Sequence, residues 1–208
     1  MHIGWDMAAY MGIRALRELE VVSHNLANAS TTGFKRELLS VWCLRLPGEA
    51  EMPPPAYVDV LSRDYSQGPL QVTENETDLA LEGPGFFKVE TPEGIRYTRN
   101  GSFRLNEARQ LVTREGYPVL GKNGPVTLDS LDGKFSVDDY YAAGPQAGEE
   151  LEPPNTRVLQ GMLEESNLNP VEEAINLILI QRKFESYLKV LDTFATADRQ
   201  VVEEIGQA

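Results

Sequence analysis

Apolar residues recur at helical spacing at both ends of this chain, and this pair of patterns constrains the fold more than any other feature. At the N-terminal end the steps alternate between four and three residues, as on the core-facing side of an amphipathic helix. That face comprises Ala8, Gly12, Ala15, Leu19, Val22 and Leu26, widened by Met11 and Leu16. We expect the helix to stop between Asn28 and Gly33, because both residues tolerate the left-handed backbone conformation. Phe34 follows the stop as an apolar anchor.

The second helical pattern has a well-marked start. Asn169 is a good N-cap, Pro170 suits the first helical position, and Glu172 lies three residues after the cap, as in a capping box. The expected face comprises Ala174, Leu177, Gln181, Phe184, Leu188, Leu191, Ala195, Asp198, Val202 and Ile205. A helix over 170–205 would be roughly 54 Å long. We expect the two terminal helices to form an antiparallel, coiled-coil-like bundle with Leu188 and Leu191 on its seam.

The middle of the chain carries strand signals. The run Pro53-Pro54-Pro55 favours an extended connector over 37–67. Two hairpins are expected beyond it, one pairing 86–90 with 95–99 and one pairing 102–105 with 110–113. The acidic stretch 138–154 is expected to be a loop. The sequence therefore predicts an α+β fold in four segments: a helix and turn at 1–36, a connector at 37–67, a small antiparallel β domain at 68–156, and a return segment with the second helix at 157–208.

Composition excludes several function classes. The chain has 32 acidic against 19 basic residues, and residues 41–168 alone hold 21 acidic and 11 basic ones. Nucleic acid and anionic membrane are poor partners for such a surface. Apolar runs such as Leu177 to Ile180 are too short to span a bilayer, and no cleavable secretory signal is expected. Cys43 is the only cysteine, so it forms no intrachain disulfide.

No pattern of residues supports catalysis or cofactor binding. His2 and His24 are too far apart for a helical metal pair, and one cysteine cannot complete a zinc set. Glu164 and Glu165 are adjacent carboxylates without an evident apolar pocket, so we expect both to be solvated. The segment 116–123 nearly matches a phosphate-binding loop, but strand signals follow it instead of a helix. We therefore expect neither metal nor cofactor, and no enzyme.

Several stretches resemble one family. The segment Asn25-Leu26-Ala27-Asn28-Ala29-Ser30-Thr31-Thr32-Gly33-Phe34-Lys35 resembles the N-terminal signature of bacterial flagellar rod and hook proteins. Similar matches, in the family's order, cover 77–87, 97–103, 110–121 and 160–173. One departure is Ala108-Arg109, which stands where the family's turn usually has a glycine. Within the family, the short length and the sequence from Gln181 to Glu185 favour a proximal-rod member over a distal-rod one.

The resemblance implies a structural subunit of the flagellar basal body, in a rod that crosses the periplasm. Its partners would be other rod subunits, copies of itself and the flagellar export apparatus, which it would pass without a cleaved signal. The implied role is to build the axial drive shaft and its channel through the terminal helices. The predicted interface residues are Leu19, Val22, Asn25, Leu26, Asn28, Gly33, Phe34, Asn167, Asn169, Leu177, Phe184, Leu188 and Leu191.

Other interpretations remain open on the sequence. A distal-rod or hook-type relative would show the same motifs. A monomeric β-domain binding module, braced by its terminal helices, is an alternative of a different class, and a hydrolase with carboxylate catalysis is a weaker one. Exposed apolar residues beyond the main helical faces, among them Phe34, Ile178, Ile180 and Tyr187, favour partner subunits over the monomeric module.

Overall fold

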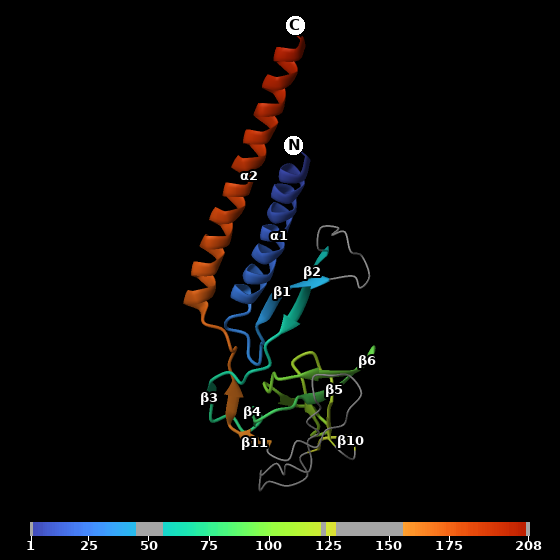
Figure 1. The fold of residues 1–208 in the computed structure, drawn as a ribbon. Coiled ribbons are helices and arrows are strands. Elements are labelled where there is room, and N and C mark those ends of the chain that lie inside the picture. Colours follow the sequence, from blue (N-terminus) through green and yellow to red (C-terminus); the bar gives the residue numbers. More distant parts are fainter. Residues whose placement is uncertain (1, 45–55, 122–123, 128–155, 207–208) are drawn as a thin grey trace. The chain divides into compact units, whose positions relative to one another are not determined.

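The computed structural model describes residues 2–44, 56–121, 124–127 and 156–206, which fall into two units (Figure 1). Unit 1 comprises Met1–Ala27, Glu37–Arg63 and Asn169–Ala208. Unit 2 comprises Asn28–Arg36 and Asp64–Leu168. The predicted stretches 53–55 and 138–154 lie outside the described residues. The division into four consecutive segments remains a prediction.

Unit 1 is built on two helices that lie side by side, α1 (His2–Ala27) and α2 (Pro170–Gly206) (Figure 1). They run antiparallel, because a Cβ built on Gly4 would lie 3.4 Å from the Phe194 ring and one built on Gly12 would lie 3.9 Å from Tyr187 Cβ. The start of α2 is the predicted one, since the Val171 N–H donates to Asn169 Oδ1 over 3.1 Å. Helix α1 ends just before Asn28, as its stop signals predict.

A two-stranded ribbon completes unit 1. Strand β1 (Glu37–Leu44) pairs antiparallel with β2 (Ala56–Arg63), with Glu37 opposite Arg63. The stretch 37–67 was expected to be an extended connector, so the structure differs here: long-range backbone pairing gives it regular strands. Asp59 on β2 ties the ribbon to α1 through an ion pair of 2.8 Å with Arg17.

Unit 2 contains the small antiparallel sheets. The largest has the order β10-β9-β5-β6, formed by β5 (Phe87–Thr91), β6 (Gly94–Thr98), β9 (Val119–Gly121) and β10 (Gly124–Pro125). Strand β7 (Arg104–Leu105) pairs with β8 (Leu111–Val112). Both predicted hairpins are therefore confirmed. In the turn between β7 and β8, Arg109 has φ +57°, the region that a glycine would favour.

The return segment, residues 157–168, closes unit 2. Strand β11 (Arg157–Gln160) pairs with β4 (Leu79–Glu82), and β12 (Met162–Glu164) pairs with β3 (Leu70–Val72). The apolar core of the unit comprises Leu79, Leu81, Phe87, Phe103, Leu111, Val119 and Val126. Within it, the rings of Phe87 and Phe103 meet edge to face at 5.1 Å. The fold class is α+β, as predicted.

The two helices are amphipathic rather than uniformly apolar. Neither α1 nor α2, taken over the described residues, is apolar enough along its length to cross a membrane.

Candidate assembly junction and helix faces

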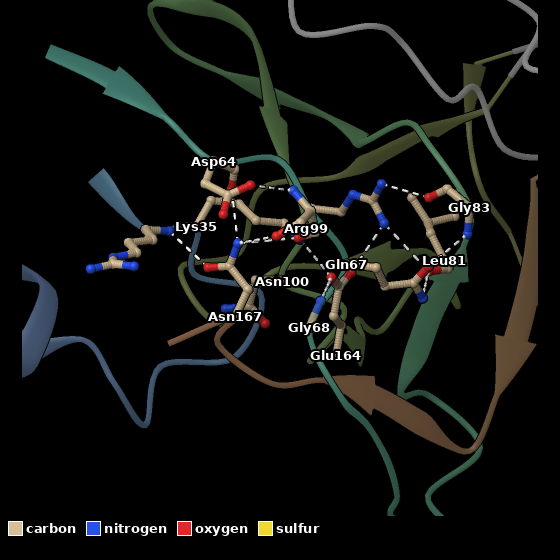
Figure 2. A network of polar contacts seen from close by, with 12 residues as sticks. Lys35, Asp64, Gln67, Gly68, Leu81, Gly83, Arg99, Asn100, Glu164 and Asn167 are labelled. Atoms are coloured by element: carbon tan, nitrogen blue, oxygen red, sulfur yellow. Dashed lines mark hydrogen bonds and ion pairs between the residues drawn. The ribbon is translucent and has the colours of Figure 1, made fainter. Parts of the chain in front are cut away.

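The signature loop, residues 28–36, is held in unit 2 by a network of buried polar side chains (Figure 2). At its centre is Glu164, at the end of β12, which is 0% exposed. Its Oε1 accepts hydrogen bonds from Lys35 Nζ over 2.6 Å and from the Gly68 N–H over 2.9 Å, and its Oε2 accepts one from Arg99 Nη1 over 3.0 Å. One buried carboxylate therefore serves two buried cations.

The burial of Glu164 corrects an expectation from the sequence. Glu164 and Glu165 were both expected to be solvated, yet only Glu165 is exposed. The reason is that Lys35 and Arg99 supply compensating charge and hydrogen bonds, which an isolated buried carboxylate would lack. These two partners lie 129 and 65 residues away in the chain, so local sequence around Glu164 carries no sign of them.

Arg99 is held by several acceptors of unit 2 besides Glu164. It donates to the carbonyl oxygens of Leu81 over 3.3 Å and Gly83 over 2.6 Å, and its guanidinium lies 5.4 Å from the centre of the Phe86 ring. Burial lowers the pKa of Arg99 from its ordinary value, and the charge of Glu164 opposes that shift. Arg99 is therefore a fixed member of the network.

Asn167 joins three segments through one side-chain amide. Its Oδ1 accepts from the Arg36 N–H over 2.8 Å, and its Nδ2 donates to the carbonyl oxygens of Asp64 over 2.9 Å and Ser66 over 3.2 Å. The Ser66 N–H in turn donates to Asp64 Oδ1 over 2.9 Å. This backbone hydrogen bond, followed by one from the Ser66 hydroxyl and by the charges of Lys35 and Arg36, lowers the pKa of Asp64.

Gly33 lies where only a glycine fits. Its φ is +68°, and its N–H donates to the Glu164 carbonyl oxygen over 2.7 Å. A Cβ built on it would lie 2.4 Å from the carbonyl carbon of Arg99 and 2.5 Å from the backbone nitrogen of Asn100. The next residue, Phe34, is half-buried, and its carbonyl accepts from the Asn167 N–H over 3.4 Å. The predicted positive φ is confirmed, and the close backbone approach adds a second requirement.

Asn28 and Asn25 act locally on either side of the helix end. In unit 2 the carbonyl of Asn28 accepts from the Thr31 N–H over 3.0 Å. In unit 1 the side chain of Asn25 is 1% exposed and binds both backbone groups of Glu37, donating to its carbonyl over 2.8 Å and accepting from its N–H over 2.9 Å. The Asn25 side chain therefore makes the two backbone hydrogen bonds with Glu37 that a neighbouring strand would otherwise make.

The main row of the predicted α1 face matches the burial pattern, but Leu16, predicted to widen that face, is 41% exposed, because it is turned about 100° from Ala15 around the helix. Ala8, Gly12 and Ala15 are buried, and Leu19, Val22 and Leu26 are half-buried. On α2 the row Leu177, Phe184 and Leu191 is half-buried as predicted.

The flanks of that α2 row differ from the prediction. Gln181, Leu188 and Ala195 are exposed, whereas Ile180 is buried and Tyr187 and Phe194 are half-buried. Both sets flank the common row at helical spacing, so the pattern alone could not choose between them. The second set faces α1, since Gly4 lies opposite the Phe194 ring and Gly12 lies opposite Tyr187 Cβ.

Both helices also carry solvent-exposed apolar side chains outside the face where α1 and α2 pack together. On α1, Trp5, Ile13 and Leu16 are exposed. On α2, Val171, Ile175, Ile178 and Leu179 are exposed, at 68%, 52%, 52% and 49%. Their spacing places these four residues on one face over the first three turns, opposite the row that packs on α1.

Sequence reasoning found Asn25, Gly33, Asn167 and Asn169 but missed the charged centre of the network. Lys35 and Arg99 lie inside two of the matched motifs, and each is the one charged residue in a motif of otherwise uncharged residues, which was the available signal. Among the residues that the structure describes, no group of three His, Cys, Asp or Glu side chains is placed to hold a metal ion. The hydrogen bonds and ion pairs of the network join the signature loop to the return segment and to residues 64–68 and 99.

Comparison with known proteins agrees with this arrangement. Three family models match: flagellar hook protein FlgE/F/G D1 domain over residues 80–177, flagellar basal body rod FlgEFG protein C-terminal over 159–203, and flagella basal body rod protein over 13–35. The flagellar basal-body rod protein FlgF of Caulobacter vibrioides is 35% identical, over 97% of this chain and 99% of its own length. FlgG of Buchnera aphidicola subsp. Schizaphis graminum is 31% identical over 91% of this chain and 93% of its own, and FlgF of Escherichia coli is 28% identical over 90% and 94%.

These matches cover the signature loop, the β unit and the second helix, in the order that the sequence motifs predicted. The chain belongs to the flagellar basal-body rod FlgEFG family, as a non-enzymatic structural rod protein of the FlgF/FlgG type.

Proposed function

We propose that this rod protein is a proximal-rod subunit that assembles through the outer faces of its terminal helices. The observation that carries the proposal is the apolar face of α2 formed by Val171, Ile175, Ile178 and Leu179, which stays exposed although α2 already packs on α1. An exposed apolar face of this kind marks a surface for a partner. Trp5, Ile13 and Leu16 extend the same argument to α1.

The partners in this proposal are copies of the chain and related rod subunits. Contacts between unlike faces of successive subunits do not close a ring and so generate a helical array. The helices would line the shaft and leave an axial channel, with the predicted interface residues Leu19, Val22, Leu26, Leu177, Phe184, Leu188 and Leu191 holding or flanking the helix pair. The short length of the chain and the sequence from Gln181 to Glu185 support the proximal assignment. Passage through the flagellar export apparatus without a cleaved signal, into the part of the rod that crosses the periplasm, belongs to the same proposal.

A pair of charge substitutions on α2 tests the proposal. Replacing Ile175 and Ile178 together by Asp should leave the stability of the free protein within about 0.5 kcal/mol, because both side chains are already in water. Assembly should fail, because the partner surface would then cover two unpaired charges. The readouts are the amount of the protein in isolated basal bodies and the motility of a strain that carries only the variant.

A matched control lies further along the same face of α2. Ser186 and Lys189 are exposed there among polar residues, and their joint replacement by Asp should leave assembly intact. Normal basal bodies with the Ile175/Ile178 variant would exclude this face as the interface. A sedimentation mass that stays monomeric at all concentrations, together with normal motility after gene deletion, would instead support the monomeric binding module.

A further inference from the structure

The signature loop draws much of its support from the opposite end of the chain. Within unit 2, the Gly33 N–H donates to the Glu164 carbonyl and the Arg36 N–H donates to Asn167 Oδ1, over 2.7 and 2.8 Å. Lys35 Nζ reaches Glu164 Oε1 over 2.6 Å. These partners are about 130 residues downstream, in the return segment, as the separations of 129 and 131 for two of the contacts show. The loop lies outside the regular helices and strands, so it has few backbone hydrogen bonds of its own.

Because of the way the charges of the network are paired, docking of the signature loop depends on Glu164 in particular. Arg99 has carbonyl acceptors and an aromatic ring within unit 2 and is 5% exposed. Lys35, 7% exposed, has Glu164 and the Ser66 carbonyl, which lies 2.6 Å from its Nζ. When the loop docks, it adds a second cation to a carboxylate already paired with Arg99. Burying that cation is favourable only while Glu164 is present and ionised.

We propose that Glu164 is a positioning residue that makes ordering of the signature loop conditional on the return segment. The loop docks when β12 has placed the Glu164 carboxylate between Arg99 and the site of the Lys35 ammonium. A chain whose return segment is not yet folded cannot order residues 28–36. For assembly, a consequence that rests on the proposed function, a subunit presents an ordered signature loop to its neighbours only after its return segment has folded.

Hydrogen exchange on the full-length free protein tests the coupling independently of rod assembly. Glu164→Gln preserves shape but removes the charge that compensates Lys35. We expect exchange at the Gly33 and Arg36 amides to become roughly 100-fold faster, as for a buried pair that loses one partner. The Leu111 and Val126 amides, which bond within the β core, should change by less than about threefold.

The neighbouring residue supplies the matched control. Glu165→Gln removes the same charge one position away, at an exposed side chain, and should leave exchange in the loop unchanged. Equal exchange in the two variants would overturn the proposal. So would a uniform acceleration in Glu164→Gln that reaches Leu111 and Val126 as strongly as Gly33, because Glu164 would then support unit 2 as a whole.

A second variant decides the matter if Glu164→Gln fails to fold. Lys35→Met leaves the Glu164–Arg99 pair balanced, so unit 2 keeps its core while the loop loses its tether. Hydrogen exchange at the amides of the signature loop should become faster in Lys35→Met. If the double variant with Glu164→Gln folds, its exchange should be accelerated by less than the product of the two separate effects. Unchanged loop exchange in Lys35→Met, or fully multiplicative effects in the double variant, would overturn the proposal.

Discussion

Two separate effects in the signature loop oppose the replacement of Gly33 by Ala. The first is backbone conformation: φ is +68°, where a residue with a Cβ is strained by about 1–3 kcal/mol. The second is space, because the new Cβ would lie 2.4 Å from the Arg99 carbonyl carbon and 2.6 Å from its oxygen. Backbone atoms cannot rotate away, so we add about 1–3 kcal/mol, as for an overpacked core site. The expected cost is about 2–6 kcal/mol.

The structure raises the expected cost of Gly33→Asn but leaves it below that of Gly33→Val. Considered from φ alone, Gly33→Asn is milder than Gly33→Val, because Asn tolerates the left-handed region. Asn carries the same Cβ, however, and meets the same backbone of Arg99 and Asn100. We therefore expect Asn to behave much like Ala, and Val to be the worst of the three.

The assay is hydrogen exchange at the Arg36 amide, which donates to Asn167 only while the loop is docked. A cost of 2 kcal/mol or more corresponds to exchange that is faster by roughly 30-fold or more. Gly116→Ala is the control, since Gly116 has φ +91° but nothing within 4 Å of a built Cβ. Its effect, measured at the Thr113 amide of its own turn, contains only the conformational cost.

The comparison between Gly33→Ala and Gly116→Ala isolates the effect of the close backbone approach at Gly33. If Gly33→Ala costs no more than Gly116→Ala, the close approach to the Arg99 backbone has no energetic weight. If Gly33→Asn has the same exchange rate at the Arg36 amide as wild type, the loop accommodates a Cβ at this position. Gly33 then does not pack as tightly on the Arg99–Asn100 backbone as described.

Two further predictions concern Asn25 and Asp64. Asn25→Ala should cost about 2–4 kcal/mol of stability, because it leaves both backbone groups of the buried Glu37 without a partner. This cost is measured as faster hydrogen exchange of the Glu37 amide. A change below about 1 kcal/mol would contradict the prediction. Since the folded-state pKa of Asp64 lies below its ordinary 3.8, its contribution to stability is complete above that pH and is lost as the pH falls through the lowered value. Loop exchange between pH 5 and pH 2 should therefore depend less on pH in Asp64→Asn than in wild type, and identical profiles would remove Asp64 from the network.

The features predicted correctly from the sequence depend on interactions between near neighbours. The start of α2 at Asn169 and Pro170, the end of α1 before Asn28 and the hairpin turn before Gly94 follow from capping and turn chemistry within a few residues. The face of α1 followed from its spacing alone, since one helical stripe was dominant.

The features that required the tertiary structure depend on partners far along the chain. Which residues flank the Leu177 row of α2 was decided by the packing of α1, where Gly4 and Gly12 lie opposite Phe194 and Tyr187, because both choices satisfy the helical repeat. The strands of 37–67 form because β1 and β2 find each other across an intervening segment. Glu164 is buried because Lys35 and Arg99 meet it there, and a carboxylate's environment depends on charges in space rather than in sequence. Capping and turn residues thus set the limits of the two helices and of the first hairpin, whereas the fold set which side chains these elements share, because packing and electrostatic compensation act between segments that only the fold brings together.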